Sequence, residues 1–330
     1  MIKRREFVRE MVAAGAASAL GFSSDLLAAE PPPETKRIRL SRYPFDVACL
    51  SPTWIAEELL RAEGFESVEY VMWKPEYQEL GHVASGAVDV EMYDFGVLLG
   101  VDAGMPLVAL AGIHGGCYGL FAAPGFRSLR DLKGKTIAVA TIGRQALVSM
   151  MAVNVGLDPR KDLQFIDSHE GVRLLAEGKV DAVLGFPPDP QLMKLRKIGV
   201  QLIDTAVDKP WSQYFCCMAI GNRDFVVKNP IATKRALRAL LKAADLCATE
   251  PERSARTLVD RGFLKDYDTS VQALRDVPYR RWREYDSADS LRFYALRLHE
   301  AGLVKSNPKK LLAQGTDWRF IEQIKREMKG

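Results

Sequence analysis

The residues best suited to binding a ligand lie where an apolar strand runs into a helix. Residues 136–140 are apolar or β-branched, which predicts a buried strand, and a Thr-Ile-Gly turn precedes a helix expected to begin near Arg144. The first N–H groups of a helix lack intrahelical partners and lie at the positive end of its dipole. Such a turn favours the binding of an anion, and the guanidinium of an arginine there adds positively charged donors. The binding residues expected at this turn are Thr141, Gly143, Arg144 and Gln145. An ordinary strand-to-helix connection remains the alternative interpretation.

Further candidate binding residues follow other predicted strands. Residues 38–90 alternate between strand and helix, which predicts a largely parallel sheet with helices on its faces. Ligands of such folds bind beyond the carboxyl ends of the strands. The side chains expected there are Arg42 as a second cation, Tyr43, Tyr93, Asp94 and His114. Trp54, Phe186 and Trp211 are expected to add apolar walls, although Phe186 also suits a packing role, and His114 beside two glycines also suits a turn.

Two similar segments indicate a second lobe built on the same plan as the first. Residues 84–90 read Ala-Ser-Gly-Ala-Val-Asp-Val, and residues 176–182 read Ala-Glu-Gly-Lys-Val-Asp-Ala. Each segment predicts a helix end, a glycine cap and a strand. The last third of the chain, from Asn229-Pro230 onward, has apolar residues at helical spacing. The sequence therefore predicts an α/β protein with a helical tail.

The composition is that of a globular protein and argues against a membrane-spanning segment and against nucleic acid as a partner. The chain has 330 residues, of which 48% are hydrophobic and 27% charged, with no apolar run near the roughly 18 residues of a membrane span. The 46 basic and 42 acidic residues are spread along the chain, giving a net charge of +4. Without a basic block, nucleic acid is not an expected partner.

The first 29 residues have the organisation of an export signal. Lys3-Arg4-Arg5 precedes an apolar stretch at 11–21, and Ala28-Ala29 precedes a proline-rich linker at 30–35. The paired arginines resemble those of a twin-arginine (Tat) signal peptide. An amphipathic first helix is the alternative. We expect a soluble protein exported to the periplasm.

The cysteine pattern favours buried thiols over a metal site. The five cysteines are Cys49, Cys117, Cys216, Cys217 and Cys247, and their odd number leaves at least one unpaired within the chain. Cys216 and Cys217 face opposite sides if they lie on a strand, so a bridge between them is not expected. No Cys-x-x-Cys or paired-histidine spacing accompanies them. We expect neither a metal nor a cofactor.

Several short segments together resemble one known family. They occur in the family's order over roughly residues 36–250, at 57–64, 86–95, 102–107, 129–139, 156–162 and 178–182. The segment at 129–139 reads Leu-Arg-Asp-Leu-Lys-Gly-Lys-Thr-Ile-Ala-Val, and the segments together form a fairly specific signature. The chain resembles the periplasmic substrate-binding proteins of ABC transporters of the nitrate/sulfonate/taurine (NitT/TauT) type, within the NMT1/THI5-like superfamily of thiamine-pyrimidine-precursor binders.

The resemblance implies a bilobal type II periplasmic-binding-protein fold with the ligand in the cleft. The implied organisation is a first lobe at 36–121, a second lobe at 122–214, and a return strand with C-terminal helices at 215–330. The chain would cross between lobes near 121–125 and near 214–218. The implied function is capture of a small organic molecule, anionic or aromatic, by a monomer that delivers it to the permease and ATPase subunits of an importer.

Two other functions remain open. An enzyme on the same scaffold could act on an aromatic or pyrimidine-type substrate through His114 or a cysteine, but no nucleophile, base and orienting group occur at a recognisable spacing. A sensor or chaperone-like subunit would need a protein partner that the sequence does not identify. The bulky first-strand loop at 42–46 leaves the ligand's identity open.

Overall fold

The strands of this protein pair into three sheets. The computed structural model describes residues 30–75 and 80–328, so the expected export signal lies outside the described residues. Residues from Pro33 onward form one unit. Within it, β1 (Arg37–Arg42) and β2 (Ser67–Met72) pair in parallel. A second sheet has β10 (Cys217–Asn222) between β3 (Val90–Asp94) and β4 (Leu107–His114), antiparallel to both.

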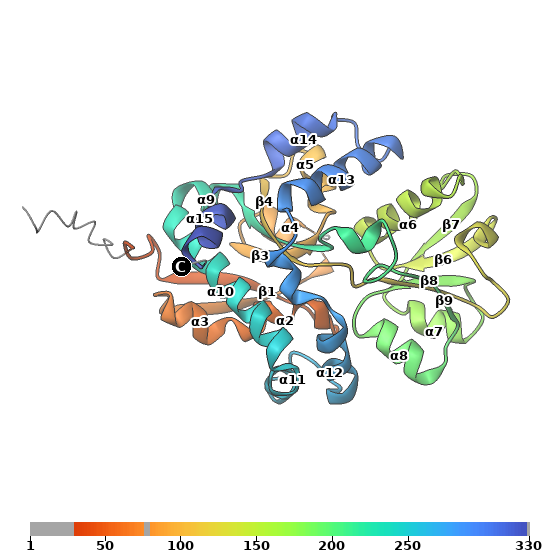
Figure 1. Ribbon diagram of the computed structural model, residues 1–330, viewed down its shortest axis with the longest axis horizontal. Coiled ribbons are helices and arrows are strands. Elements are labelled where there is room, and N and C mark those ends of the chain that lie inside the picture. The colour runs from red at the N-terminus through yellow and green to blue at the C-terminus, as the bar shows by residue number, and fades with distance from the viewer. Residues whose placement is uncertain (1–29, 76–79, 329–330) are drawn as a thin grey trace, which may run out of the picture. The chain divides into compact units, whose positions relative to one another are not determined.

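The third sheet has five strands in the order β7-β6-β8-β5-β9 (Figure 1). Their bounds are β5 (Gly119–Ala122), β6 (Lys135–Val139), β7 (Leu163–Asp167), β8 (Ala182–Gly185) and β9 (Val200–Asp204). Strand β6 runs parallel to β7 and β8, as expected, whereas β5 runs antiparallel to its neighbours. Two parallel neighbouring strands must be joined by a crossover connection, usually a helix, whereas antiparallel neighbours need none. The strands that pair antiparallel are therefore those that no crossover helix has to join. The predicted α/β class is confirmed.

The chain passes between the second and third sheets at two connections. Strand β5 already belongs to the five-stranded sheet, so the first connection is residues 115–118 and not the expected 121–125. The second runs from Thr205, after β9, to Cys216, before β10. The two connections are tied together because the Tyr118 N–H donates to Thr205 Oγ1 at 2.8 Å and the Thr205 N–H donates to Tyr118 O at 2.9 Å.

Glycine is required at position 116 in the first connection. A Cβ built on Gly116 would lie 1.9 Å from Thr205 O, inside the backbone of the second connection. The two connections can therefore approach this closely only without a side chain at Gly116.

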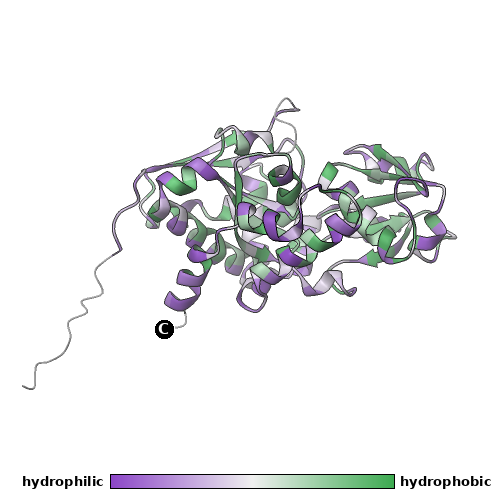
Figure 2. Cartoon of the chain, turned by 90° about the horizontal axis from the view of Figure 1, so that it is seen from above, coloured by the Kyte–Doolittle hydropathy of each residue, from purple (hydrophilic) through white to green (hydrophobic). Residues whose placement is uncertain are grey.

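Helices surround the strands. Those between the strands are α2 (Ser51–Ile55), α3 (Glu57–Ala62), α4 (Gly81–Ala84), α5 (Val97–Asp102), α6 (Ile142–Asn154), α7 (Gly171–Ala176) and α8 (Asp189–Arg196). The helical C-terminal third contains α9 (Arg223–Lys228), α10 (Pro230–Thr249), α11 (Pro251–Asp260), α12 (Tyr267–Asp276), α13 (Ser287–Glu300), α14 (Pro308–Gly315) and α15 (Arg319–Glu327). Hydrophobic residues gather on the strands and inner helix faces (Figure 2). Among the described residues, no helix is both long enough and apolar enough to cross a bilayer.

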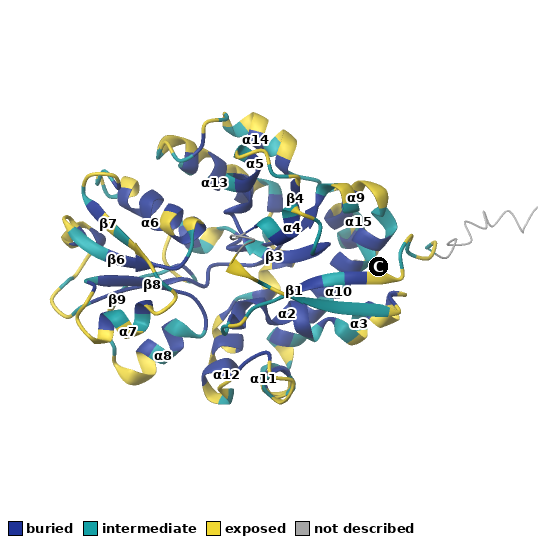
Figure 3. Cartoon of the chain, turned by 180° about the vertical axis from the view of Figure 1, so that it is seen from behind, coloured by how far each residue is buried: buried dark blue, intermediate teal, exposed yellow. Residues whose placement is uncertain are grey.

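The buried residues likewise lie on the strands and on the inner faces of the helices (Figure 3). All eight residues of β4 and all four of β8 are buried, which explains their continuous apolar sequences. Helix α10 packs its apolar side inward, and its first N–H groups, those of Ile231 and Ala232, donate to the Glu34 carboxylate at 2.9 and 2.8 Å. A residue of the expected linker thus caps α10.

Candidate functional site

A cavity of about 900 Å³ lies where strand ends of two sheets meet the first turn of α6. The loop after β1 supplies Tyr43 and Phe45, and β3 ends with Tyr93 and Asp94. The five-stranded sheet contributes Thr141 and Arg144 after β6, His169 after β7, and Phe186 after β8. The site therefore follows the rule that ligands bind at the carboxyl ends of strands.

Arg144 is the one predicted cation that reaches this cavity. Arg144 is only 8% exposed, and its Cζ lies 3.5 Å from the centroid of the Phe186 ring. Its Nε and Nη1 atoms are buried and have no hydrogen-bond partner among the described residues. Burial opposes the charged form, but the neighbouring Tyr118, Asp94, Tyr93 and Asp189 outweigh that effect and raise the pKa of Arg144. A permanently charged guanidinium with donors to spare therefore faces the cavity.

The first turn of α6 already has an anionic neighbour. Asp94 accepts hydrogen bonds from the Tyr118 hydroxyl and the Gly96 N–H, both at 2.7 Å. A Cβ on Gly143 would come within 2.9 Å of Asp94 Oδ1, so the carboxylate lies against this turn. Thr141 accepts from the Arg144 N–H at 3.2 Å and is the N-cap of the helix. The helix terminus is thus partly satisfied within the protein, which leaves the Arg144 side chain as the group for an anionic ligand.

Tyr43 is held in the cavity wall by a buried polar group. Its hydroxyl donates to Glu91 Oε1, and Glu91 Oε2 lies 3.0 Å from His82 Nε2. The side chains of Glu91 and His82 are fully buried. Burial, followed by the Glu91 charge, raises the pKa of Tyr43 well above its ordinary value, so the phenol stays protonated and remains a donor.

Among the residues of the cavity wall that sequence reasoning missed are two with aromatic rings, Trp73 and His169. Trp73 follows β2 and His169 follows β7, so both stand at strand ends, where the same rule would have found them. The His169 ring lies against Phe45, with centroids 4.4 Å apart, so residues from two lobes meet there. Burial and then the charge on Arg144 lower the pKa of His169, which leaves a neutral imidazole near neutral pH.

Sequence reasoning also missed Asp189, the first residue of α8, which interacts electrostatically with Arg144. Burial raises its pKa to about 6, although the Arg144 charge acts in the opposite direction. This carboxyl group is close enough to Arg144 to contribute to its charge balance.

Several predicted residues lie away from the cavity. Arg42 donates to Gly262 O at 2.9 Å, and its guanidinium lies over the Phe263 ring. Trp54 also stacks on the Phe263 ring, with ring centroids 5.2 Å apart, and its Nε1–H donates to Ser41 O. Trp211 is buried against Phe293. Gln145 is exposed on α6, and Gly143 serves by its closeness to Asp94. The structure therefore brings Tyr43, Tyr93, Asp94, Thr141, Arg144 and Phe186 together and leaves the others outside.

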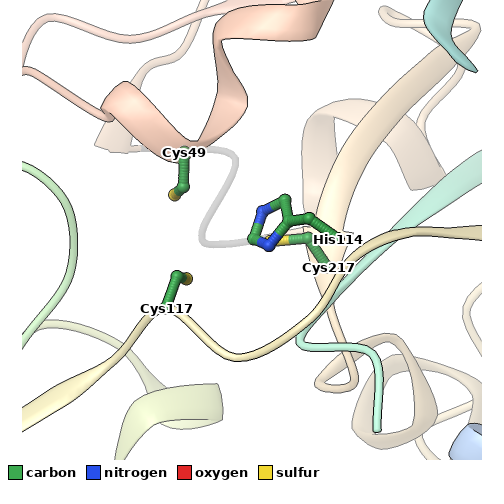
Figure 4. Close-up of side chains that lie close together, drawn as sticks. All are labelled: Cys49, His114, Cys117 and Cys217. Carbon is green, nitrogen blue, oxygen red and sulfur yellow. The ribbon is translucent and has the colours of Figure 1, made fainter. Parts of the chain in front are cut away.

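His114 lies beneath the cavity among cysteines (Figure 4). The five cysteines are buried free thiols, as expected. The structure nevertheless brings Cys49, Cys117 and Cys217 around His114, with one ligand atom of each within 4.8 Å of the others. Its members come from three segments: His114 and Cys117 stand three residues apart in one stretch, whereas Cys49 and Cys217 are distant in the sequence, so spacing alone did not reveal the full set. Cys49 and Cys217 also line the cavity.

Comparison with known proteins identifies the fold and a family model. The model described as NMT1/THI5 like matches residues 60–254, more than half of the chain. No curated protein matches the chain in sequence.

Many solved structures share the fold. The periplasmic nitrate-binding protein NrtA from Synechocystis PCC 6803 superposes with a TM-score of 0.76 at 16% identity, covering 90% of each chain. The alkanesulfonate-binding protein SsuA from Xanthomonas axonopodis pv. citri, bound to MOPS, gives 0.69 at 18% identity, covering 88% of this chain and all (100%) of that one. The desulfurization enzyme DszB gives 0.58 at 14% identity, covering 88% of this chain and 99% of that one. These likenesses confirm the expected bilobal type II periplasmic-binding-protein fold.

Proposed function

The chain belongs to the NMT1/THI5-like family, and on that premise we propose that it is the solute-binding component of an ABC importer. Its ligand is a small organic anion, an aromatic or aliphatic carboxylate or sulfonate. The protein is exported to the periplasm, works as a monomer, and passes its ligand to the permease and ATPase subunits at the inner membrane.

The observation that carries this proposal is the unpartnered guanidinium of Arg144. Two of its nitrogens lack hydrogen-bond partners among the described residues although they are buried. A buried donor without a partner costs free energy, and a carboxylate or sulfonate in the cavity would supply acceptors in the geometry that a guanidinium prefers. The stacking of this group on Phe186 holds its plane before the ligand arrives.

The other walls of the cavity favour an organic ligand over a bare inorganic ion. Aromatic side chains at Tyr43, Phe45, Trp73, Tyr93 and Phe186 line a volume of about 900 Å³. A space of this size fits a drug-sized molecule, and its walls offer ring faces for apolar contact. An anionic head at Arg144 with an aromatic or aliphatic body along these walls would use both features.

Ligand binding would also report the state of the lobes. The cavity draws residues from both large sheets, so a ligand that contacts both favours the closed arrangement by its difference in affinity. Closure is the signal that a permease of this class would read.

An enzyme on the same scaffold is the competing function, since the structural relatives include DszB. Cys49 and Cys217 reach the cavity, but His114, their partner in the cluster, is fully buried. Arg144 and the aromatic walls serve a binding role without any reaction. We therefore favour binding without turnover.

A thermal-shift screen of the purified protein tests the proposal. The panel contains alkanesulfonates, aromatic and aliphatic carboxylates, nitrate and pyrimidines. An anion present at about 100 times its dissociation constant adds about 2.7 kcal/mol to the stability of the folded state, which should raise the unfolding midpoint by about 5 °C. Mass spectrometry should recover the ligand unchanged. Conversion of the ligand would support the enzyme instead, and a hit confined to neutral pyrimidines would contradict the anion.

A further inference from the structure

Four buried side chains from three segments of the chain converge at the floor of the ligand cavity. Cys49 lies in the short helical turn Ala48–Leu50, and His114 is the last residue of β4. Cys117 lies in the first connection between the sheets, and Cys217 is the first residue of β10. Their ligand atoms lie within 4.8 Å of one another, and their side chains surround a common space (Figure 4).

The backbone fixes two of these residues relative to each other. Cys217 is the register partner of His114 in the antiparallel pair of β10 and β4. The Cys216 N–H donates to His114 O at 3.0 Å, which secures the pairing at its end. Two of the four residues are therefore held by strand pairing, while Cys117 and Cys49 come from the connection after β4 and from the turn Ala48–Leu50.

The orientation of His114 is that of a metal-binding imidazole. Its Nδ1 lies 2.7 Å from Gly115 O, and because a carbonyl only accepts, Nδ1 carries the proton. Nε2 therefore holds the free lone pair, and it is buried without a hydrogen-bond partner among the described residues. A backbone carbonyl that fixes the tautomer in this way is a recurrent partner of histidines that bind metals. Tyr279 packs edge-on against the ring, with centroids 5.3 Å apart, and limits its rotation.

The thiols are close together without being bonded. Cys117 and Cys216 have their Sγ atoms 3.3 Å apart, whereas a disulfide requires about 2.05 Å. In a tetrahedral zinc site with Zn–S bonds of about 2.3 Å, neighbouring sulfurs are about 3.8 Å apart. The cluster has this scale, so a small inward movement of the side chains would close it around an ion.

We propose that Cys49, His114, Cys117 and Cys217 form a tetrahedral Cys₃His site for a thiophilic divalent cation, with zinc(II) as its occupant. Three thiolates and one imidazole complete four-coordination, which is the ligand set of a structural zinc site. Binding transfers the three thiol protons to solvent and leaves a site with a net charge of −1. The ion would join the first connection, β10 and the turn at Ala48–Leu50 at the floor of the cavity. The inference does not depend on the identity of the organic ligand, and its test uses none.

Cobalt(II) is the probe, because tetrahedral thiolate coordination gives it intense d–d absorption in the visible range. The full chain is stripped of metal by a chelator under reducing, oxygen-free conditions and titrated with cobalt(II). We expect saturation at one equivalent with sulfur-to-cobalt charge-transfer bands, and loss of these bands when one equivalent of zinc(II) is added. Metal analysis of the protein as purified should find zinc at a similar ratio.

Matched variants locate the site. Cys49→Ser and His114→Gln should each weaken cobalt binding by about 100-fold or more, since even groups that only orient a ligand contribute about 10- to 100-fold. Cys247→Ser removes a buried thiol of α10 outside the cluster and should leave the titration unchanged. Circular dichroism identifies a variant that fails to fold, and the wild-type titration stands without any variant.

Three results would overturn the proposal. If wild-type protein with five free thiols bound neither cobalt nor zinc, the cluster would be a group of buried thiols and not a metal site. A Cys117–Cys216 disulfide found by peptide mapping would remove one ligand from the site. Cobalt bands that survive Cys49→Ser and His114→Gln in folded protein would place the ion elsewhere.

Discussion

The guanidinium of Arg144 stacks on the ring of Phe186, with Cζ 3.5 Å from the ring centroid. Arg144 stands in the first turn of α6, which follows β6, and Phe186 directly follows β8, so the pair comes from the ends of two neighbouring strands of one sheet. A stacked guanidinium can still donate in its own plane, toward an acceptor in the cavity. The contact therefore orients the charge without using its hydrogen bonds.

Replacing Phe186 should weaken ligand binding through this contact. Phe186→Leu keeps an apolar side chain but removes the ring, and a cation–π contact contributes about 0.5–2 kcal/mol. We expect a loss of affinity of about 2- to 30-fold in calorimetric titration with an anion identified by the screen. Phe186→Tyr keeps the ring and is the control. Equal affinity in the Leu variant would show that the stacking does not orient Arg144.

The hydroxyl of Tyr43 should matter more for stability than for binding. It donates to the buried Glu91, which also contacts His82. Tyr43→Phe leaves Glu91 with one donor fewer, a cost of about 1–3 kcal/mol in the free energy of unfolding measured with urea. The ring remains in the cavity wall, so ligand affinity should change by less than about 3-fold, a difference of under 1 kcal/mol. A large loss of affinity at unchanged stability would instead place the hydroxyl in contact with the ligand.

Gly116 should be among the least replaceable glycines of the chain. An alanine Cβ there would lie 1.9 Å from Thr205 O, and neither connection can yield easily because Tyr118 and Thr205 are hydrogen-bonded to each other. We expect Gly116→Ala to destabilise the protein by about 3 kcal/mol or more, or to prevent folding.

Gly104 is the matched control for this substitution. It has positive φ, but a Cβ there has no heavy atom within 4 Å. Gly104→Ala should therefore cost only the left-handed backbone penalty of about 1–2 kcal/mol. Similar melting temperatures for both variants would contradict the close contact of the two connections.

Asp189 should make stability depend on pH. Burial raises its folded-state pKa to about 6, above the unfolded value of about 3.9. The fold thus favours the protonated form, so the stability linked to this group is complete below about pH 4 and is lost as the pH rises through about 6.

The variant Asp189→Asn isolates this effect. Its free energy of unfolding should match that of the wild type near pH 4 and exceed it by about 3 kcal/mol near pH 7. Urea denaturation at several pH values measures the difference. A difference that is constant with pH would show that Asp189 is not a titrating buried group.

Local sequence patterns predicted the helices and strands better than they predicted which strands pair with each other. The apolar residues at 136–140 and the Thr-Ile-Gly turn placed β6 and the start of α6 within two residues, because both depend on neighbouring side chains. The first connection was placed too late because nothing local distinguishes β5 from a continuation of the first lobe. Its membership in the five-stranded sheet depends on pairing with β8, more than 60 residues away.

The site shows the same limit. Arg144, Tyr43 and Asp94 were found because strand ends are visible in the sequence, and the rule for α/β sheets applies to them. Arg42 also ends a strand, but its guanidinium lies over the ring of Phe263 in the helical tail, and Trp54 of α2 stacks on the same ring. The cluster pairs the local His114-x-x-Cys117 spacing with Cys49 and Cys217, which only long-range packing brings to it, so the sequence could not reveal the full set.

Calorimetric titration of wild type and Arg144→Gln with the best anion of the screen tests the central claim most directly. Loss of the buried charge should cost about 2–5 kcal/mol, a loss of affinity of about 30-fold or more. Arg42→Gln, which removes an arginine that lies outside the cavity, should bind as the wild type does. Equal affinity in Arg144→Gln and the wild type would contradict the assignment of Arg144 as the anion-binding group.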